Sequence, residues 1–406
     1  MRVADYKLLV LFLLITATLL IRVLVEQTGY CSHDSYYYLK AAQNIILGKR
    51  YYQSDFLIVS HTKTAEINKY LTTWPAGYSL LIAGFAFVFF LPVFWAAKMV
   101  NIFFLGLCFL LFRKIQKDKA YMLGLIFCSF TFLEIFSYTW SEGPFLFGLL
   151  WFVFSLSKYL QNYSKTSYLI QLFCSALLLF LIRYIGGFSF IIIASFSGFL
   201  FITKKYRPAI NLLILFVILS FLAGLYFYNN YLQTGIIIGG GRLDTVQEST
   251  GLFLWHLFTG LLNEFSIIRN YYWRGEPANF YIAAFLFQAI ILFLIYYKYL
   301  KGTISFSESI DNVGFLFTVT GFTYLVIIVF LRFLSPTFPF DYRILSPFTF
   351  CLFTALMLYL IQPEQTAKYK GAYNYIIFLF SASLILNLPK EYLISYFQDL
   401  FQQFFT

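Results

Sequence analysis

The chain has 406 residues, of which 60% are hydrophobic and only 12% are charged, and it carries a net charge of +11. Soluble globular proteins carry about 25% charged residues, so this composition excludes a soluble enzyme, a disordered chain and a secreted disulfide scaffold. We therefore interpret the chain as an integral membrane protein with many spans, whose basic residues set its topology and do not indicate a nucleic-acid partner.

Eleven apolar runs are long enough, with their flanks, to cross a bilayer as helices. In chain order they are 8–25, 97–112, 120–137, 143–157, 167–182, 185–203, 209–228, 280–297, 313–331, 344–361 and 372–388. Only helices and closed barrels satisfy their backbones in lipid, and the chain lacks the alternating pattern of a barrel. The sequence thus predicts an all-α polytopic fold of about eleven transmembrane helices with external juxtamembrane helices.

One further run, from Tyr78 to Phe94, determines the topology. If it is seated in the membrane without crossing it, the basic loop 113–119 and the later basic loops all fall in the cytoplasm. The positive-inside rule requires that arrangement. We therefore predict a cytoplasmic N-terminus, an external C-terminus and a membrane-seated helix at this run.

The sequence predicts a single transmembrane domain over 1–388, followed by an interfacial amphipathic tail over 389–406. Two external regions, 26–96 and 229–279, are too long to be simple connectors. Long loops in compact proteins are usually functional, so these two regions are expected to form the active-site side.

Two carboxylates are expected on that external side of the membrane. Asp34 follows the first span, and Glu142 lies in a very short loop directly before an apolar run. Each has a structural alternative, because Asp34 is a good helix N-cap and Glu142 suits a helix start. Ionisable groups at the membrane boundary are costly and are functional candidates, and two carboxylates together suit general-base chemistry on a hydroxyl.

Three arginines are expected near the same face: Arg183, Arg343 and Arg242, the last after three consecutive glycines. Arginine offers a two-pronged donor for phosphate oxygens, and glycines let a backbone approach a ligand closely. The alternative for each is interfacial snorkelling. Carboxylates and arginines at the outer lipid boundary favour an anionic lipid carrier as substrate over a soluble nucleotide sugar.

Five short motifs then occur in order along the chain. They are Asp34 with Tyr36–Tyr38, Ala41, Ala42 and Gly48; Trp74-Pro75-Ala76-Gly77-Tyr78; Glu142-Gly143-Pro144-Phe145; Arg183-Tyr184; and Tyr342-Arg343-Ile344-Leu345-Ser346-Pro347. Together they resemble the GT-C glycosyltransferases of the dolichyl-phosphate-mannose-protein mannosyltransferase type (family-39-like), which are related to the lipid A aminoarabinose transferases.

The resemblance implies roles for individual residues. Asp34 would be the catalytic base, with Glu142 orienting the acceptor or supporting that base. Arg183, Arg343 and Arg242 are the candidates for binding the lipid phosphate. Further substrate contacts are expected at His33, Tyr37 and Tyr78. No cofactor is expected; if a divalent metal did bind, the conceivable ligands would be Asp34, His33 and Glu142.

The function implied is an inverting transfer of a sugar from a polyprenyl-phosphate-linked donor to a hydroxyl of a lipid, glycan or protein. The reaction is expected on the outer face of a bacterial inner (plasma) membrane, with membrane lipids as neighbours and no nucleic acid. Two alternatives stay open: a polysaccharide polymerase, and a lipid-linked glycan flippase or transporter. A transporter should show internal pseudo-repeats, and none is visible in the sequence.

Overall fold

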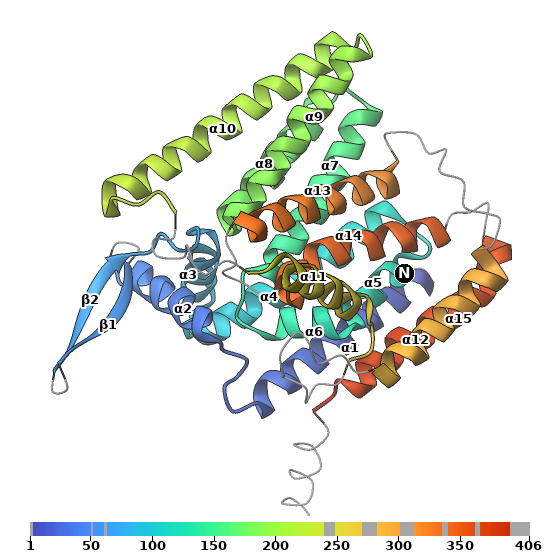
Figure 1. The fold of residues 1–406 in the computed structure, drawn as a ribbon, viewed down its shortest axis with the longest axis horizontal. Helices are drawn as coiled ribbons and strands as arrows, with labels where there is room; N and C mark the ends of the chain where they lie inside the picture. The colour runs from blue at the N-terminus through green and yellow to red at the C-terminus, as the bar shows by residue number, and fades with distance from the viewer. Residues whose placement is uncertain are drawn as a thin grey trace, which may run out of the picture.

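The computed structural model describes residues 3–49, 52–60, 63–238, 248–269, 282–300, 312–334, 340–361 and 366–389. This part of the chain is overwhelmingly helical, as predicted (Figure 1). The helices are α1 (Val3–Val25), α2 (His33–Ile46), α3 (Gly77–Phe89), α4 (Val93–Ile115), α5 (Ala120–Gly124), α6 (Phe130–Ser137), α7 (Glu142–Gln161), α8 (Thr166–Ile182), α9 (Phe188–Ile202), α10 (Tyr206–Thr234), α11 (Thr250–Phe265), α12 (Ile282–Ile295), α13 (Val313–Leu334), α14 (Tyr342–Leu360) and α15 (Thr366–Leu386). Short helical turns η1 (Leu125–Cys128), η2 (Tyr184–Gly187) and η3 (Tyr296–Leu300) link or extend them.

Seven helical segments in the described residues are long and apolar enough to cross a membrane. They are α1, α4, α7, η2 with α9, α10, α13 and α14. The bent segment 120–137 and the shorter apolar helices α8, α12 and α15 occupy the other runs that the sequence analysis interpreted as spans. The protein is a membrane protein, and the total of eleven spans stays a prediction.

The run 120–137 is a broken helix and not the straight span that its composition suggested. Its two halves, α5 with η1 and then α6, meet at an angle of 75°. The break falls at Ser129, which has an extended backbone, and the Phe130 N–H donates to the Ile267 carbonyl (3.2 Å). Non-helical backbone is tolerated at membrane depth only where other parts of the protein satisfy it, and this segment is buried almost throughout.

The run from Tyr78 to Phe94 folds as α3, which has 13 residues and ends at Phe90 in a left-handed conformation. At 1.5 Å per residue such a helix measures about 20 Å, shorter than the ~30 Å hydrocarbon core. Its length therefore agrees with a helix that is seated in the membrane without crossing it.

One element was not predicted from the sequence. Residues 52–60 (β1) and 63–70 (β2) form a two-stranded antiparallel hairpin, in which Tyr52 pairs with Tyr70. The hairpin extends away from the helices beside α2 and near one end of α10 (Figure 1), and β2 contacts α10. It lies within the region 26–96, which the sequence analysis predicted to be external.

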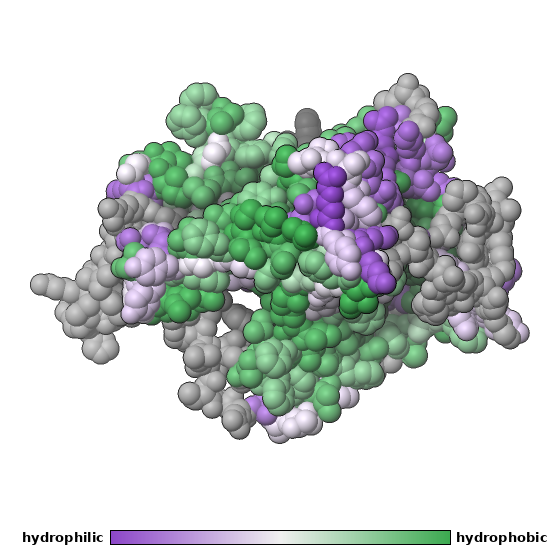
Figure 2. Space-filling view, turned by 90° about the horizontal axis from the view of Figure 1, so that it is seen from above, coloured by the Kyte–Doolittle hydropathy of each residue, from purple (hydrophilic) through white to green (hydrophobic). Residues whose placement is uncertain are grey.

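The hydrophobic core consists of side chains that pack between neighbouring helices. The outer surface of the helices is apolar as well. The packed pairs α7–α8, α9–α10 and α13–α14 contribute many of the helix contacts. On α10, large apolar side chains such as Ile214, Val217 and Phe221 are exposed. The broad hydrophobic surface in Figure 2 is therefore a surface suited to lipid, as expected of a membrane protein. The predicted tail beyond residue 389 lies outside the described residues.

Candidate active site at one end of the helix bundle

Four of the side chains singled out in the sequence meet at one end of the bundle. Asp34 comes from the first turn of α2, Glu142 from the first turn of α7, Arg183 from the junction of α8 and η2, and Arg343 from the first turn of α14. These residues are up to 309 positions apart in the chain. Each stands at a helix end, so rigid elements position all four charged groups.

Arg343 links the two carboxylates. Its Nη1 donates to Oδ2 of Asp34, and its Nε donates to Oε1 of Glu142. The guanidinium carbon also lies 4.7 Å from the centre of the Trp140 ring. Two hydrogen bonds and a cation–π contact fix the plane of this guanidinium more firmly than one ion pair could.

Glu142 is fully buried and forms a second ion pair, with Arg183 (Oε1 to Nη1, 2.5 Å). Arg183 is held in a tight turn between two antiparallel helices. A Cβ added at Gly186 would lie 2.2 Å from the carbonyl carbon of Leu179, so only glycine allows this turn to close. A buried carboxylate with two guanidinium partners is fully neutralised, and the remaining guanidinium charge is balanced by Asp34.

Asp34 is not the N-cap of α2, contrary to the structural alternative considered for it. Ser32 takes that position, and its N–H donates to the Ser35 Oγ (2.9 Å). The Asp34 carboxylate, with a quarter of its side chain exposed, is therefore left to face Arg343. Gly48, the glycine of the first motif, lies just beyond the end of this helix with φ +68°.

A rigid aromatic layer lies behind the carboxylates. Tyr38 is buried and shares a hydrogen bond with the Ser141 hydroxyl (3.2 Å), and its ring packs edge-on against Tyr78 (5.0 Å between ring centres). The Tyr78 hydroxyl donates to Oδ1 of Asn101 (3.2 Å). Burial of the Tyr38 hydroxyl raises its pKa well above the ordinary tyrosine value, so this group stays a neutral phenol.

The other predicted substrate contacts differ in accessibility. His33 is exposed and stacks on Tyr37, which in turn stacks on Trp74, so a row of aromatic rings begins at the residue next to Asp34. Tyr78 is fully buried behind Tyr38, so its substrate contact stays a prediction. Arg242 lies outside the described residues.

A second cluster of ionisable residues was missed in the sequence. The fully buried Glu264 of α11 accepts hydrogen bonds from Thr131 (3.1 Å) and Thr349 (3.4 Å) and pairs with Arg269 (3.4 Å). Close by, α6 pairs Glu134 with the buried Arg22 of α1. An ionisable residue inside an apolar run, as Glu134 is, was the available signal.

The described residues include no group of three or more His, Cys, Asp or Glu side chains that could hold a metal ion. In particular, Arg343 lies between Asp34 and Glu142, where a cation shared by the two carboxylates would otherwise lie. The site offers one partly exposed carboxylate, two guanidinium groups and a neighbouring row of aromatic rings. Such an arrangement can accept a proton and bind an anionic group side by side.

No known protein-family model matches the sequence, and no curated protein matches it. Solved structures do match. ArnT from Cupriavidus metallidurans, bound to undecaprenyl phosphate, superposes with a TM-score of 0.51 at 10% identity and matches 91% of this chain. The chain has the GT-C fold.

A second match is the oligosaccharyltransferase of Archaeoglobus fulgidus in its apo form, with a TM-score of 0.49 at 12% identity over 97% of this chain. The chain spans less than two thirds of either neighbour: 63% of ArnT and 55% of the oligosaccharyltransferase. The likeness to ArnT thus covers nearly all of this chain, whereas ArnT contains residues beyond the matched part.

Proposed function

We propose that this GT-C chain is a glycosyltransferase that moves a sugar from a polyprenyl-phosphate-linked donor to a hydroxyl of a lipid, glycan or protein. The observation that carries the proposal is the link that Arg343 makes between Asp34 and Glu142 at the end of the bundle. A base and an anion-binding group in contact are what glycosyl transfer from a lipid phosphate requires. The neighbour ArnT, which shares this fold, was solved bound to undecaprenyl phosphate, and this supports the choice of carrier.

Asp34 acts as the general base. The acceptor hydroxyl oxygen attacks the anomeric carbon while its proton passes to the Asp34 carboxylate. The bond between the anomeric carbon and the phosphate oxygen breaks, and the lipid phosphate leaves with the electron pair. A single displacement of this kind inverts the configuration at the anomeric carbon. Among the site's two carboxylates, Asp34 is the exposed one and can reach an acceptor.

Arg183 and Arg343 stabilise the charge that develops on the departing phosphate. Removing one preorganised donor of this type lowers the catalytic rate about 10²–10³-fold. Glu142 holds both guanidinium groups in place from a position that is closed to solvent. When the phosphate binds, it competes with Asp34 for Arg343, and this frees the Asp34 carboxylate to meet the acceptor.

The charge neutralisation that a divalent metal would supply comes in this proposal from the two arginines, so transfer proceeds without a metal. We expect the initial rate of transfer to be unchanged by prior treatment with EDTA. A rate that falls with EDTA and returns with Mg²⁺ or Mn²⁺ would contradict this part of the proposal.

The active face is assigned to the outer side of a bacterial inner membrane. The site end of the bundle then lies outside, and the basic loop after α4 lies in the cytoplasm, as the positive-inside rule requires. Membrane lipids surround the helices and supply the polyprenyl-phosphate donor laterally.

The experiment that tests the proposed function uses purified protein in liposomes with a panel of radiolabelled polyprenyl-phosphate sugars and a membrane extract as acceptor. Transfer of label into acceptor, with inversion at the anomeric carbon by NMR, is expected for at least one donor. Growth of long glycan chains would indicate a polymerase instead. Movement of intact donor across the bilayer without transfer would indicate a flippase, and both outcomes would overturn the proposal.

A further inference from the structure

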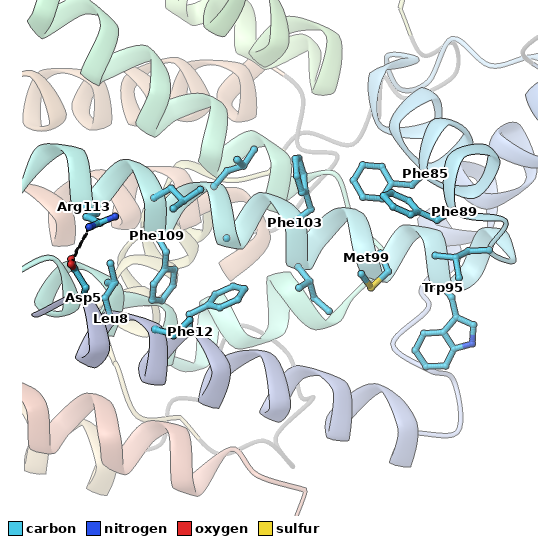
Figure 3. A pocket seen from close by; sticks show the side chains of 16 residues that line it. Asp5, Leu8, Phe12, Phe85, Phe89, Trp95, Met99, Phe103, Phe109 and Arg113 are labelled. Atoms are coloured by element: carbon cyan, nitrogen blue, oxygen red, sulfur yellow. Dashed lines mark hydrogen bonds and ion pairs between the residues drawn. The ribbon is translucent and has the colours of Figure 1, made fainter. Parts of the chain in front are cut away.

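Two apolar cavities flank α4. Both reach its C-terminal end at Arg113, and the first also extends along the helix to Met99 and Trp95 near the site end. The first, about 950 Å³, lies between α1, α3 and α4 and is lined by side chains such as Leu8, Phe12, Phe103 and Phe109 (Figure 3). The second, about 570 Å³, lies between α4, α7 and α8 and is lined by Phe147, Trp151 and Phe154 among others. Neither cavity includes a residue of the candidate active site.

The two cavities share three residues of α4: Leu107, Leu110 and Arg113. Leu110 is more than half exposed, so α4 presents a lipid-facing ridge with a hollow on either side. In a bilayer, hollows of this composition at the protein surface are filled by hydrocarbon chains. A ridge between two hollows suits a molecule with two chains.

Cationic groups gather where the hollows meet. Arg113 lines both cavities, Lys114 and Lys117 line the second, and all three are exposed. Arg113 is held over the gap between α1 and α4 by two hydrogen bonds to the Asp5 carboxylate (2.8 and 3.0 Å). This end of the bundle carries more basic than acidic residues. The basic residues are Lys7, Arg113, Lys114, Lys117 and Lys119, and the acidic ones are Asp5 and Asp118.

This basic end lies far from the candidate active site. The site end of α4 is fixed by Lys98, whose Nζ donates to the Ser137 carbonyl (2.8 Å) beside the Glu142 loop. Arg113 follows about 22 Å further along the helix, at 1.5 Å per residue. The whole of α4 has 23 residues and measures about 34 Å, enough to cross the ~30 Å hydrocarbon core, so its two ends belong to opposite membrane interfaces.

We propose that this surface binds one anionic glycerophospholipid, with its phosphate on Arg113, Lys114 and Lys117 and one acyl chain in each hollow beside α4. Charge complementarity selects an anionic headgroup, because Lys and Arg side chains near a membrane surface attract anionic lipids. The polyprenyl carrier is a different ligand: it has a single long chain, and its phosphate is assigned to the opposite interface. The lipid site does not depend on the proposed function.

The test is native mass spectrometry of the purified chain, titrated with phosphatidylglycerol or with phosphatidylcholine of the same acyl chains. Wild type should bind one molecule of phosphatidylglycerol at a much lower lipid concentration than it needs to bind phosphatidylcholine. The double variant Lys114→Ala/Lys117→Ala should lose about tenfold or more in that affinity. The control is Lys204→Ala/Lys205→Ala, which removes two exposed lysines elsewhere and should keep it.

A second variant addresses the acyl chains. Gly106 lines the first cavity, and a Cβ added there meets only Phe12 at 3.6 Å, an ordinary contact. The first atom of a larger side chain therefore fits at this position, and Gly106→Leu should fill the hollow and weaken phosphatidylglycerol binding. The thermal unfolding midpoint of this variant is measured beside its binding, to confirm that it folds.

Equal affinity for phosphatidylglycerol and phosphatidylcholine would overturn the proposal. So would an equal loss of phosphatidylglycerol affinity in Lys114→Ala/Lys117→Ala and in the control Lys204→Ala/Lys205→Ala. Displacement of the bound lipid by an equimolar amount of polyprenyl phosphate would also overturn it, because the site would then belong to the carrier.

Discussion

Arg343 is the residue on which the candidate site depends. Its guanidinium bonds to Asp34 and Glu142 through different nitrogens and covers the Trp140 ring. A lysine could keep the charge but not this geometry, because an ammonium is a point charge without a planar fork. Arg343 thus sets both the position of the base and the shape of the anion-binding face.

We expect Arg343→Lys to lower the rate of transfer about 100-fold, in line with the loss of one preorganised donor. The measurement is the initial rate of sugar transfer at saturating donor. Arg207→Lys, an exposed arginine at the start of α10, is the matched control and should retain full activity. A rate for Arg343→Lys within twofold of this control would contradict the assigned role.

Glu264 gives the fold a pH dependence. Burial raises the pKa of its carboxyl from 4.5 to about 8, although nearby Arg269 and the Thr131 hydroxyl both act to lower it. The raised value means that the folded state favours the protonated acid. The stability that this preference contributes is complete below about pH 4.5 and is lost as the pH rises toward 8.

The variant Glu264→Gln keeps the shape of the side chain and removes this titration. Its unfolding midpoint relative to wild type should therefore rise steadily between about pH 5 and pH 8. Thermal unfolding in detergent across this range measures the difference. A difference that is constant with pH would show that Glu264 does not titrate in the folded chain.

Some of these residues could be predicted from the sequence and others could not. Asp34 and Glu142 were identifiable because each is an isolated carboxylate beside an apolar run. Glu264 was not, since its partner Thr131 is 133 residues away and only tertiary packing brings the two together. The Ser32 cap was missed because Asp34 two residues later is an equally good cap by type.

At the scale of single elements, α3 depends on one close approach. A Cβ at Gly77 would lie 2.4 Å from the Leu181 carbonyl oxygen of α8, so this glycine lets the first turn of α3 touch that helix. Its neighbour Tyr78 supports Tyr38 of the site. The packing of a helix seated in the membrane is thereby tied to the geometry around Asp34.

We expect Gly77→Ala to destabilise the protein by about 1–3 kcal/mol, the usual cost of forcing atoms into a packed contact. Gly84→Ala on the same helix is the control, since a Cβ there meets nothing within 4 Å. The control should be neutral or slightly stabilising because alanine favours helix over glycine. Equal unfolding midpoints for the two variants would argue against the close contact.

The elements that the sequence failed to predict are those in which tertiary contacts override local pattern. The run 120–137 has the composition of a span, yet it bends at Ser129 because the Ile267 carbonyl satisfies the freed N–H of Phe130. The hairpin over 52–70 lies in a polar region without strong alternation. By contrast, the long apolar helices α4 and α10 were predicted as helices: α4 begins and ends within four residues of the run 97–112, and α10 extends six residues beyond the run 209–228.

For the whole molecule, the two ends of α4 must lie on opposite sides of the membrane. Two exposed positions suit single introduced cysteines: Lys49, next to α2, and Lys117, after α4. In a background without the native cysteines, a membrane-impermeant thiol reagent added to intact cells should label Lys49→Cys and miss Lys117→Cys. Labelling at Lys117 would mean that α3 crosses the membrane and that the predicted topology is wrong.

The helical membrane fold was predictable because length and apolarity determine what can cross a bilayer. The site could be anticipated only as a set of candidates on one face. That Arg343 lies between the two carboxylates follows from the packing of α2, α7 and α14, which no local pattern contains.

The central claim is that Asp34 is the base of a sugar transfer at this site. The most direct measurement compares wild type, Asp34→Asn and the distant exposed control Asp118→Asn in single-turnover transfer and in donor binding. The account predicts that Asp34→Asn binds donor within a few-fold of wild type and loses transfer by about 10²-fold or more, while Asp118→Asn keeps both donor binding and transfer. Transfer by Asp34→Asn at the wild-type rate would contradict it.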